Sequence, residues 1–132
     1  MEFWQEMMAD RSDGLHIVIE NVMDDEPYMM ARIMERIKIP DIRLCLDVGN
    51  ASCVGSVQPR EWLEVLAPYI GHIHLHNNDG TYDYHGSVFD GKTDMGDFLE
   101  RAIELCGEDT TFTVESLEGL SSMKWLEERG FI

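Results

Sequence analysis

Short hydrophobic runs rich in β-branched residues alternate along the chain with segments in which apolar residues recur at helical spacing. The runs span residues 15–20, 42–47, 70–76 and 111–115. A helical pattern follows each run, and one more helix is predicted before residue 10 with no strand ahead of it. Because the runs are apolar almost throughout, as buried parallel strands are, four successive βα units predict an α/β fold with a parallel sheet.

Several predicted helices have recognisable ends. Asp24 and Asp25 are suited to cap the first helix after a strand, with Pro27 near its first position. Asp94 is suited to cap the helix that follows the long polar loop. The last helix, predicted at 122–129, ends at Gly130, which we expect to adopt the left-handed conformation.

The segments between these ends are also predictable. A Gly/Ser loop is expected directly after the 42–47 run, before a helix that begins at Pro59. Apolar spacing assigns Ile33 to the buried face of one helix and Ile103 to the buried face of another.

Length and charge narrow the class of protein. The 132 residues suffice for one domain, and 10 basic against 26 acidic side chains give a net charge of −16. So acidic a surface repels phosphate backbones and anionic membranes, which disfavours nucleic acid and membrane partners. Three cysteines without a paired Cys-x-x-Cys motif are typical of reduced thiols in a cytoplasmic protein.

Each predicted strand ends in a side chain that can bind a metal or transfer a proton. Glu20, Asp47 and His74 lie 27 residues apart, and Glu115 follows after a further 41. One strand-helix-loop unit therefore returns the chain to the same rim, where α/β folds carry their chemistry. Three oxygen donors and one nitrogen suit a divalent metal ion such as Mn²⁺, Mg²⁺, Co²⁺ or Zn²⁺.

Each of these residues also has a structural interpretation. Glu20 is alternatively a cap or a salt-bridge residue, and Asp47 is suited to open a turn. The histidines at 72, 74 and 76, which alternation places on one face of a strand, are alternatively hydrogen-bonded core residues. The loop carboxylates Asp83 and Asp90 are suited to solvent exposure. Four such residues at the ends of four successive strands favour a site over these separate explanations.

Three segments, Ile17–Asn21, Cys45–Asn50 and His72–Gly80, resemble motifs of the xylose isomerase-like TIM-barrel superfamily. That superfamily is the sugar phosphate isomerase and epimerase group, which also includes the family 2 AP endonucleases. The resemblance continues through residues 83–85, 91–94 and 113–116, and the order of the motifs is its specific feature.

The resemblance implies a function and a set of roles. A divalent metal ion would be held by Glu20, Asp47, His74 and Glu115, and the two glutamates would transfer protons next to the carbonyl of a sugar or sugar phosphate. Residues around the rim would bind the substrate: Asn50, His76, Asn77, Asp83 and His85. The chain would accordingly be an isomerase or epimerase of carbohydrate metabolism.

Two departures from the family pattern leave alternatives open. Asn50 stands where the endonuclease branch has a metal-binding histidine, although Asp83 and His85 resemble the Asp-x-His of that branch, so an AP endonuclease-like phosphodiesterase is the second hypothesis. A complete (β/α)₈ barrel needs about 250 residues. Residues 1–132 would therefore form one half-barrel unit equivalent to strands five to eight, completed by a second copy or by a missing N-terminal half. A non-catalytic metal-binding half-barrel is the third hypothesis.

Overall fold

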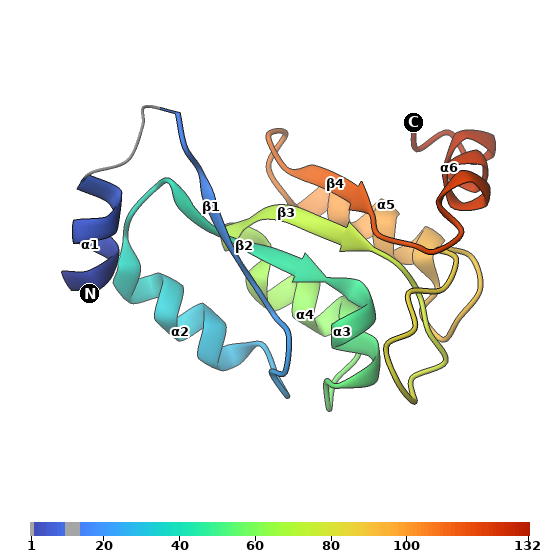
Figure 1. The fold of residues 1–132 in the computed structure, drawn as a ribbon, viewed down its shortest axis with the longest axis horizontal. Helices are drawn as coiled ribbons and strands as arrows, with labels where there is room; N and C mark the ends of the chain where they lie inside the picture. Colours follow the sequence, from blue (N-terminus) through green and yellow to red (C-terminus); the bar gives the residue numbers. More distant parts are fainter. Residues whose placement is uncertain (1, 10–13) are drawn as a thin grey trace.

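The computed structural model describes residues 2–9 and 14–132 and shows strands alternating with helices (Figure 1). Its elements in chain order are α1 (Glu2–Ala9), β1 (Ile17–Glu20), α2 (Tyr28–Ile37), β2 (Ile42–Asp47), α3 (Val48–Cys53), α4 (Pro59–Leu66), the 3₁₀ helix η1 (Ala67–Tyr69), β3 (Ile70–Leu75), α5 (Met95–Leu105), β4 (Thr111–Val114) and α6 (Gly119–Glu128). The four predicted strands and the helices between them are thus confirmed.

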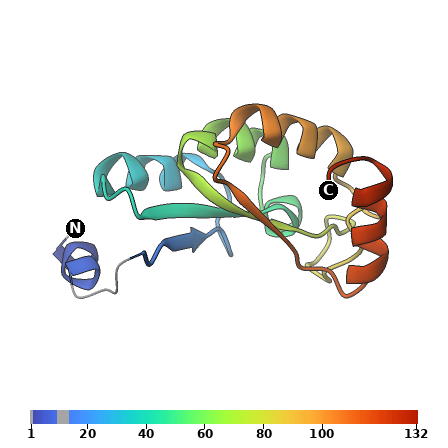
Figure 2. The ribbon, with the colours of Figure 1, turned by 90° about the horizontal axis from the view of Figure 1, so that it is seen from above.

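The four strands form one sheet in the order β1-β2-β3-β4, and every neighbouring pair is parallel. Parallel neighbours require a crossover between them, and helices supply it here. Helices α2, α4 and α5 lie along one face of the sheet, and within residues 2–9 and 14–132 no helical layer covers the opposite face (Figure 2). This is the predicted α/β fold of four successive βα units, the arrangement of one half of a (β/α)₈ barrel.

The hydrophobic core lies between the sheet and those helices. Leu44 and Leu46 of β2 and Ile73 of β3 are at most 1% exposed, and they pack with Trp62 of α4 and Phe98 of α5. Each such side chain stabilises the fold by about 1.5–3 kcal/mol through burial. Alternation along the strands sends the intervening side chains to the uncovered face.

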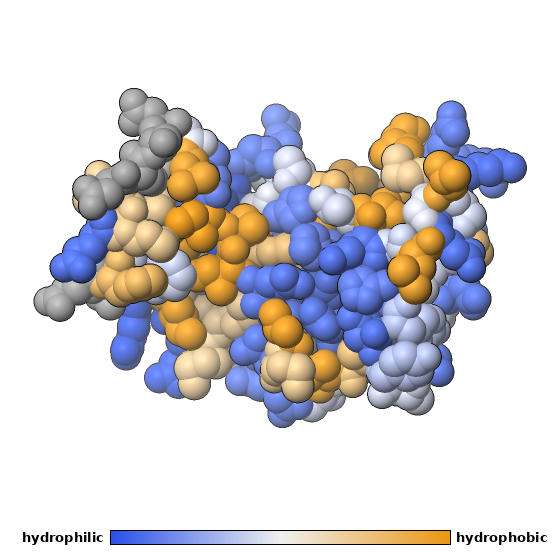
Figure 3. Space-filling view, viewed as in Figure 1, coloured by the Kyte–Doolittle hydropathy of each residue, from blue (hydrophilic) through white to orange (hydrophobic). Residues whose placement is uncertain are grey.

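The uncovered face of the sheet is polar. Hydrophilic side chains gather over its middle, with hydrophobic ones to either side (Figure 3). The strand residues that alternate with the core positions are Val18, Glu20, Arg43, Cys45, Asp47, His72, His74, Thr111 and Thr113. The candidate chemistry therefore lies on the face that the helices leave open.

A bulge at Gly71 sets which residues of β3 reach this face. Leu44 pairs with Ile70, but the next residue, Cys45, pairs with His72, so one extra residue stands in β3. Both Ile70 and Ile73 are consequently in the core, which strict alternation would forbid. The bulge brings His74 level with Asp47 and with Thr113 of β4.

Two helix ends agree with the prediction. The Asp94 carboxylate caps α5 by accepting a hydrogen bond of 3.1 Å from the backbone N–H of Asp97. After α6, Gly130 adopts a φ of +76°, and the N–H of Phe131 donates to the carbonyl of Leu126 over 3.0 Å. This is the hydrogen bond of a Schellman motif, which favours glycine at that position.

Other local predictions were wrong. The expected Gly/Ser loop after β2 begins as the short helix α3, whose cap is the Asp47 side chain. Helix α2 has Pro27 at its cap position and no side-chain capping bond, so neither Asp24 nor Asp25 caps it. Ile33 and Ile103 are 46% and 61% exposed, so the buried faces of α2 and α5 are narrower than the apolar spacing predicted. Among the described residues, no helix has the length and apolar character needed to cross a membrane.

Candidate functional site

Four side chains from the four strand ends converge on the uncovered face. The Nδ1 atom of His74 lies 2.8 Å from Oε2 of Glu115, 3.5 Å from Oε1 of Glu20 and 3.5 Å from Oδ2 of Asp47. One potential ligand atom from each of the four residues lies within 4.8 Å of all the others. The strand-end spacing in the sequence therefore corresponds to a real cluster in space.

The four side chains differ in their access to solvent. The Asp47 side chain is only 1% exposed, whereas those of Glu20 and Glu115 are 36% and 43% exposed. The two glutamates come from β1 and from the residue after β4, at the two edges of the sheet, with His74 between them. A ligand entering from the open face would reach the glutamates before it reached Asp47.

Negative charge accumulates at the cluster. Partial burial raises the pKa of Glu20, and the nearby carboxylates of Asp47 and Glu115 raise it further, against the opposing effect of His74. Burial, together with the charges of Glu20 and Asp47, also raises the pKa of Cys45 to about 12. Both shifts indicate that the site favours a positive charge or bound protons over three free carboxylates.

The cluster fits a divalent metal ion. The Nδ1 atom of His74 is inaccessible to solvent and makes no well-aligned hydrogen bond, despite its three carboxylate neighbours. A buried polar atom without a hydrogen bond lowers the stability of the folded chain unless another group binds it. Three carboxylates and an imidazole are the ligand types that Mn²⁺, Mg²⁺, Co²⁺ and Zn²⁺ accept.

Asp47 is held in place by Asn21, which the sequence did not identify as functional, and by the backbone of Asn50. Asn21, the residue after β1, donates from Nδ2 to the carbonyl of Asp47 over 3.0 Å and accepts from its N–H over 2.7 Å. The backbone N–H of Asn50 donates to Oδ1 of Asp47 over 2.6 Å. The adjacency of Glu20 and Asn21 in one motif was the only sequence signal for this clamp.

The residues expected to bind substrate lie in two different settings. His76 and Asn77 are 0% and 1% exposed. Nδ2 of Asn77 donates to the carbonyls of Val88 and Thr93, which ties down the loop after β3. The polar atoms of both residues face protein groups; their contact with substrate hydroxyls stays a prediction, and His76 is assigned a positioning role below.

The remaining expected substrate ligands lie at the rim. Asp83 and His85 are partly exposed, with Oδ2 of Asp83 3.0 Å from Nε2 of His85. Asn50 is partly buried beside Asp47.

The pKa of the buried His76 imidazole is raised. Burial lowers this pKa, but the hydrogen bond to Asp47 and the charges of Asp47 and Asp83 outweigh that effect.

His72 lies one layer below the cluster. Its Nδ1 lies 2.6 Å from the hydroxyl of Thr111, and its Nε2 lies 3.0 Å from that of Thr113. Burial, and then the neighbouring His74, lower its pKa. Both nitrogens of His72 are bonded to hydroxyls, as the alternative interpretation predicts, but His72 is partly exposed on the uncovered face and is not a core residue.

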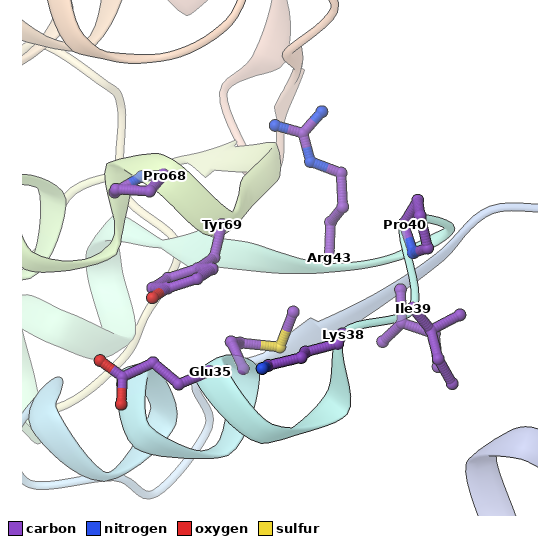
Figure 4. A pocket seen from close by; sticks show the side chains of 9 residues that line it. Glu35, Lys38, Ile39, Pro40, Arg43, Pro68 and Tyr69 are labelled. Carbon is purple, nitrogen blue, oxygen red and sulfur yellow. The ribbon is translucent and has the colours of Figure 1, made fainter.

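A hollow of about 510 Å³ lies away from this cluster (Figure 4). Its walls come from the end of α2, the segment leading into β2 and the 3₁₀ helix η1, and include Glu35, Lys38 and Tyr69. It lies at the amino ends of the strands, whereas the four converging side chains lie at the carboxyl ends. None of those four side chains lines it.

Comparison with known proteins places the chain in a family. A family model described as "Xylose isomerase-like TIM barrel" matches residues 1–128. The chain is 28% identical over 112 residues to the uncharacterized protein MJ1311 of Methanocaldococcus jannaschii, covering 78% of this chain and 37% of that protein. It is 26% identical over 87 residues to the uncharacterized protein MJ1614 of the same organism, covering 64% of this chain and 34% of that protein.

The fold matches a solved structure as well. A crystal structure of a D-tagatose 3-epimerase-like protein superimposes with a TM-score of 0.73 at 25% identity, covering 87% of this chain and 46% of that one. The chain therefore spans less than half the length of each of these similar proteins. Its four βα units correspond to half of a TIM barrel.

Proposed function

The chain belongs to the xylose isomerase-like TIM-barrel family, and on that premise we propose that it is the metal-bearing half of a sugar isomerase or epimerase. The reaction is the transfer of a proton next to the carbonyl of a sugar or sugar phosphate. The observation that supports this most directly is the convergence of four potential ligands from four successive strands within 4.8 Å.

In this proposal the divalent ion is held by Glu20, Asp47, His74 and Glu115. When bound, it stabilises the negative charge that develops on the substrate oxygen as a neighbouring proton leaves. The buried carboxylate of Asp47 and the imidazole of His74 serve as ligands only, since neither offers a wide solvent-facing surface.

The two glutamates also transfer the proton. Glu20 and Glu115 are the two most exposed members of the cluster and stand at opposite edges of the sheet, so each can reach a different side of a bound carbon. One removes the proton and the other returns it.

A second four-stranded unit completes the barrel in this proposal. In the described part of the chain, β1 and β4 each have a neighbouring strand on one side only, and the face between them is open. Two copies of this chain, each with a net charge of −16, would repel each other. Their two clusters of three carboxylates would also face each other at the same end of the barrel. The charge therefore favours a different, less acidic half over a second copy. A dimer of this chain in native mass spectrometry would contradict that choice.

The phosphodiesterase hypothesis has less support from the site. Asn50 offers an amide where a multi-metal phosphodiesterase of this superfamily would need an imidazole, and the acidic surface opposes DNA binding. Incision of DNA containing abasic sites by the purified protein would revive it.

The proposed reaction is tested by deuterium exchange. The chain is incubated with Mn²⁺ in D₂O with a panel of ketohexoses that includes D-tagatose, and NMR follows deuterium entering next to the carbonyl. We expect exchange, and a fall of about 10²–10⁴-fold in Glu20→Gln and in Glu115→Gln, since each loses an acid/base group.

Glu108→Gln is the matched control, because that carboxylate is exposed in the loop between α5 and β4, at the opposite end of the strands. It should exchange as the unmodified chain does. A chain that holds Mn²⁺ but exchanges no substrate proton would by itself be a non-catalytic metal-binding half-barrel, and the proposed activity would then be withdrawn for this chain alone.

A further inference from the structure

A buried histidine connects the metal cluster to the loop after β3. His76 has no solvent exposure, and its Nε2 lies 2.9 Å from both carboxylate oxygens of Asp47. An ionised carboxylate can only accept, so Nε2 carries the proton and donates it. On the other side of the ring, Nδ1 lies 3.2 Å from Oδ1 of Asp83, within ion-pair distance but without a well-aligned hydrogen bond.

The carboxylate of Asp83 is in turn enclosed by its neighbours. Its Oδ2 lies 3.0 Å from Nε2 of His85, and Nδ2 of Asn78 donates to Oδ1 over 3.4 Å. The rings of His76 and His85 stack with centroids 4.1 Å apart and an interplanar angle of 10°. His85 is one of two described non-glycine residues with a positive φ, at 50°, so the loop is bent to place this ring.

The chain of contacts returns to the cluster at its far end. Nδ1 of His85 lies 2.8 Å from the backbone carbonyl of Glu115, a member of the cluster from the other edge of the sheet. The N–H of Leu117 donates to the carbonyl of His85 over 3.0 Å. Asp47 and Glu115 are thus joined through three side chains of one loop.

We propose that His76 and Asp83 are positioning residues of the metal site, which fix the orientation of the Asp47 carboxylate through the contact sequence Asp47–His76–Asp83–His85. This inference rests on the proposed function, because it takes Asp47 to be a metal ligand. His76 itself is out of reach of substrate and of the ion held by the four-residue cluster.

The geometry explains why Asp47 needs such support. It is 1% exposed, so no bulk water completes its hydrogen bonds, and the carboxylate must be held by protein groups alone. Asn50 N–H fixes Oδ1, and His76 spans both oxygens, which leaves the remaining lone pairs directed toward His74. Removing a hydrogen-bonding partner of a metal ligand typically weakens metal affinity about 10- to 100-fold.

The affinity for Mn²⁺, measured by isothermal titration calorimetry on the whole chain, tests the inference. We expect one ion per chain, and an affinity that is about 10- to 100-fold weaker in His76→Gln and in Asp83→Asn. The double variant should be no weaker than the weaker single variant, because both act through one contact sequence. Asp83 is 23% exposed, so its variant tests the inference even if His76→Gln does not fold.

Asp90→Asn is the matched control, since it removes the same charge from an exposed position of the same loop, and it should bind within about twofold of the unmodified chain. Unchanged affinity in Asp83→Asn would overturn the inference. So would a second bound ion that Asp83→Asn removes, because Asp83, His76 and His85 would then be ligands in their own right.

A readout without metal separates this inference from the proposed function. In the metal-free chain, ¹H–¹⁵N spectra of the imidazoles should show a proton on Nε2 of His76 that exchanges slowly with water. His16, whose side chain is 69% exposed, provides the fast-exchanging reference. An unprotonated or fast-exchanging Nε2 at His76 contradicts the inference. If the slow proton is present but no Mn²⁺ binds, the proposed function fails and the contact sequence stands.

Discussion

Replacing Gly49 by alanine perturbs the proposed metal site through the His76 ring, without changing any of the four proposed ligands. Gly49 lies in α3 against the His76 ring. A Cβ atom added there would lie 1.9 Å from Cε1, 2.3 Å from Nδ1 and 2.6 Å from Nε2 of that ring. The ring is fully buried and bonded to Asp47, so it cannot move aside without losing that bond.

The cost follows from three contributions. Overpacking a buried site costs about 1–3 kcal/mol, and losing a hydrogen bond to a charged group costs about 1.5–3 kcal/mol. Alanine in a helix offsets about 1 kcal/mol of this through its higher helix propensity. The net loss in the free energy of unfolding is then about 1.5–5 kcal/mol, which for a chain of this size lowers Tm by roughly 5–20 °C.

Urea denaturation followed by circular dichroism measures this loss, with Gly96→Ala as the control. At Gly96, in the first turn of α5, the nearest atom to an added Cβ is 3.4 Å away, so alanine fits and should be neutral or slightly stabilising. The reasoning would be refuted if Gly49→Ala had the same free energy of unfolding as Gly96→Ala.

Three further predictions follow from the same contacts. At pH 8 Cys45 should resist iodoacetamide, because it is buried and its pKa is about 12, whereas the partly exposed Cys106 should react. Peptide mapping by mass spectrometry measures the labelling of each cysteine, and equal labelling would contradict this prediction. The lowered pKa of His72 contributes stability above pH 6.5 that is lost as the pH falls through the folded pKa, so His72→Gln should flatten a plot of Tm against pH below 6.5. Saturating Mn²⁺ should stabilise the chain by about 2.7 kcal/mol at one hundred times its Kd, and Asp47→Asn should abolish that gain.

The strands could be predicted because short β-branched runs alternate with segments of helical spacing. The burial on both faces that these apolar runs had indicated is not observed in this chain, since the helices cover one face of the sheet and Val18 and Phe112 are 42% and 41% exposed. Two helix ends could also be predicted from single residues. Asp94 caps α5 with its carboxylate, and Gly130 after α6 adopts the left-handed φ that a side chain disfavours. Such signals are local, so the sequence alone carries them.

Helix α3 could not be predicted, because its sequence of Val48 to Cys53 has weak helix propensity. It forms because the Asp47 side chain caps it and because Val48 and Ala51 are fully buried. Both causes depend on tertiary structure. The bulge at Gly71 is similar: the glycine within the strand is its only trace in the sequence, and the pairing with β2 decides its position.

The four strand-end residues of the candidate site were identified from spacing, because parallel strands return to one rim. Spacing says nothing about which rim residues a later loop will cover. The loop after β3 folds back on itself, with Asn77 and Gly86 exchanging backbone hydrogen bonds of 3.3 and 2.9 Å. That fold buries His76 and Asn77, whose place one step along the rim had indicated contact with substrate.

Native mass spectrometry of the chain, purified without chelator and supplied with Mn²⁺, tests the central claim most directly. We predict one divalent ion per chain, lost or greatly weakened in Asp47→Asn and in Glu115→Gln and retained in Glu108→Gln. A chain that binds no ion, or one whose ion survives the loss of both Asp47 and Glu115, would show that the convergence of the four strand ends is not a metal site.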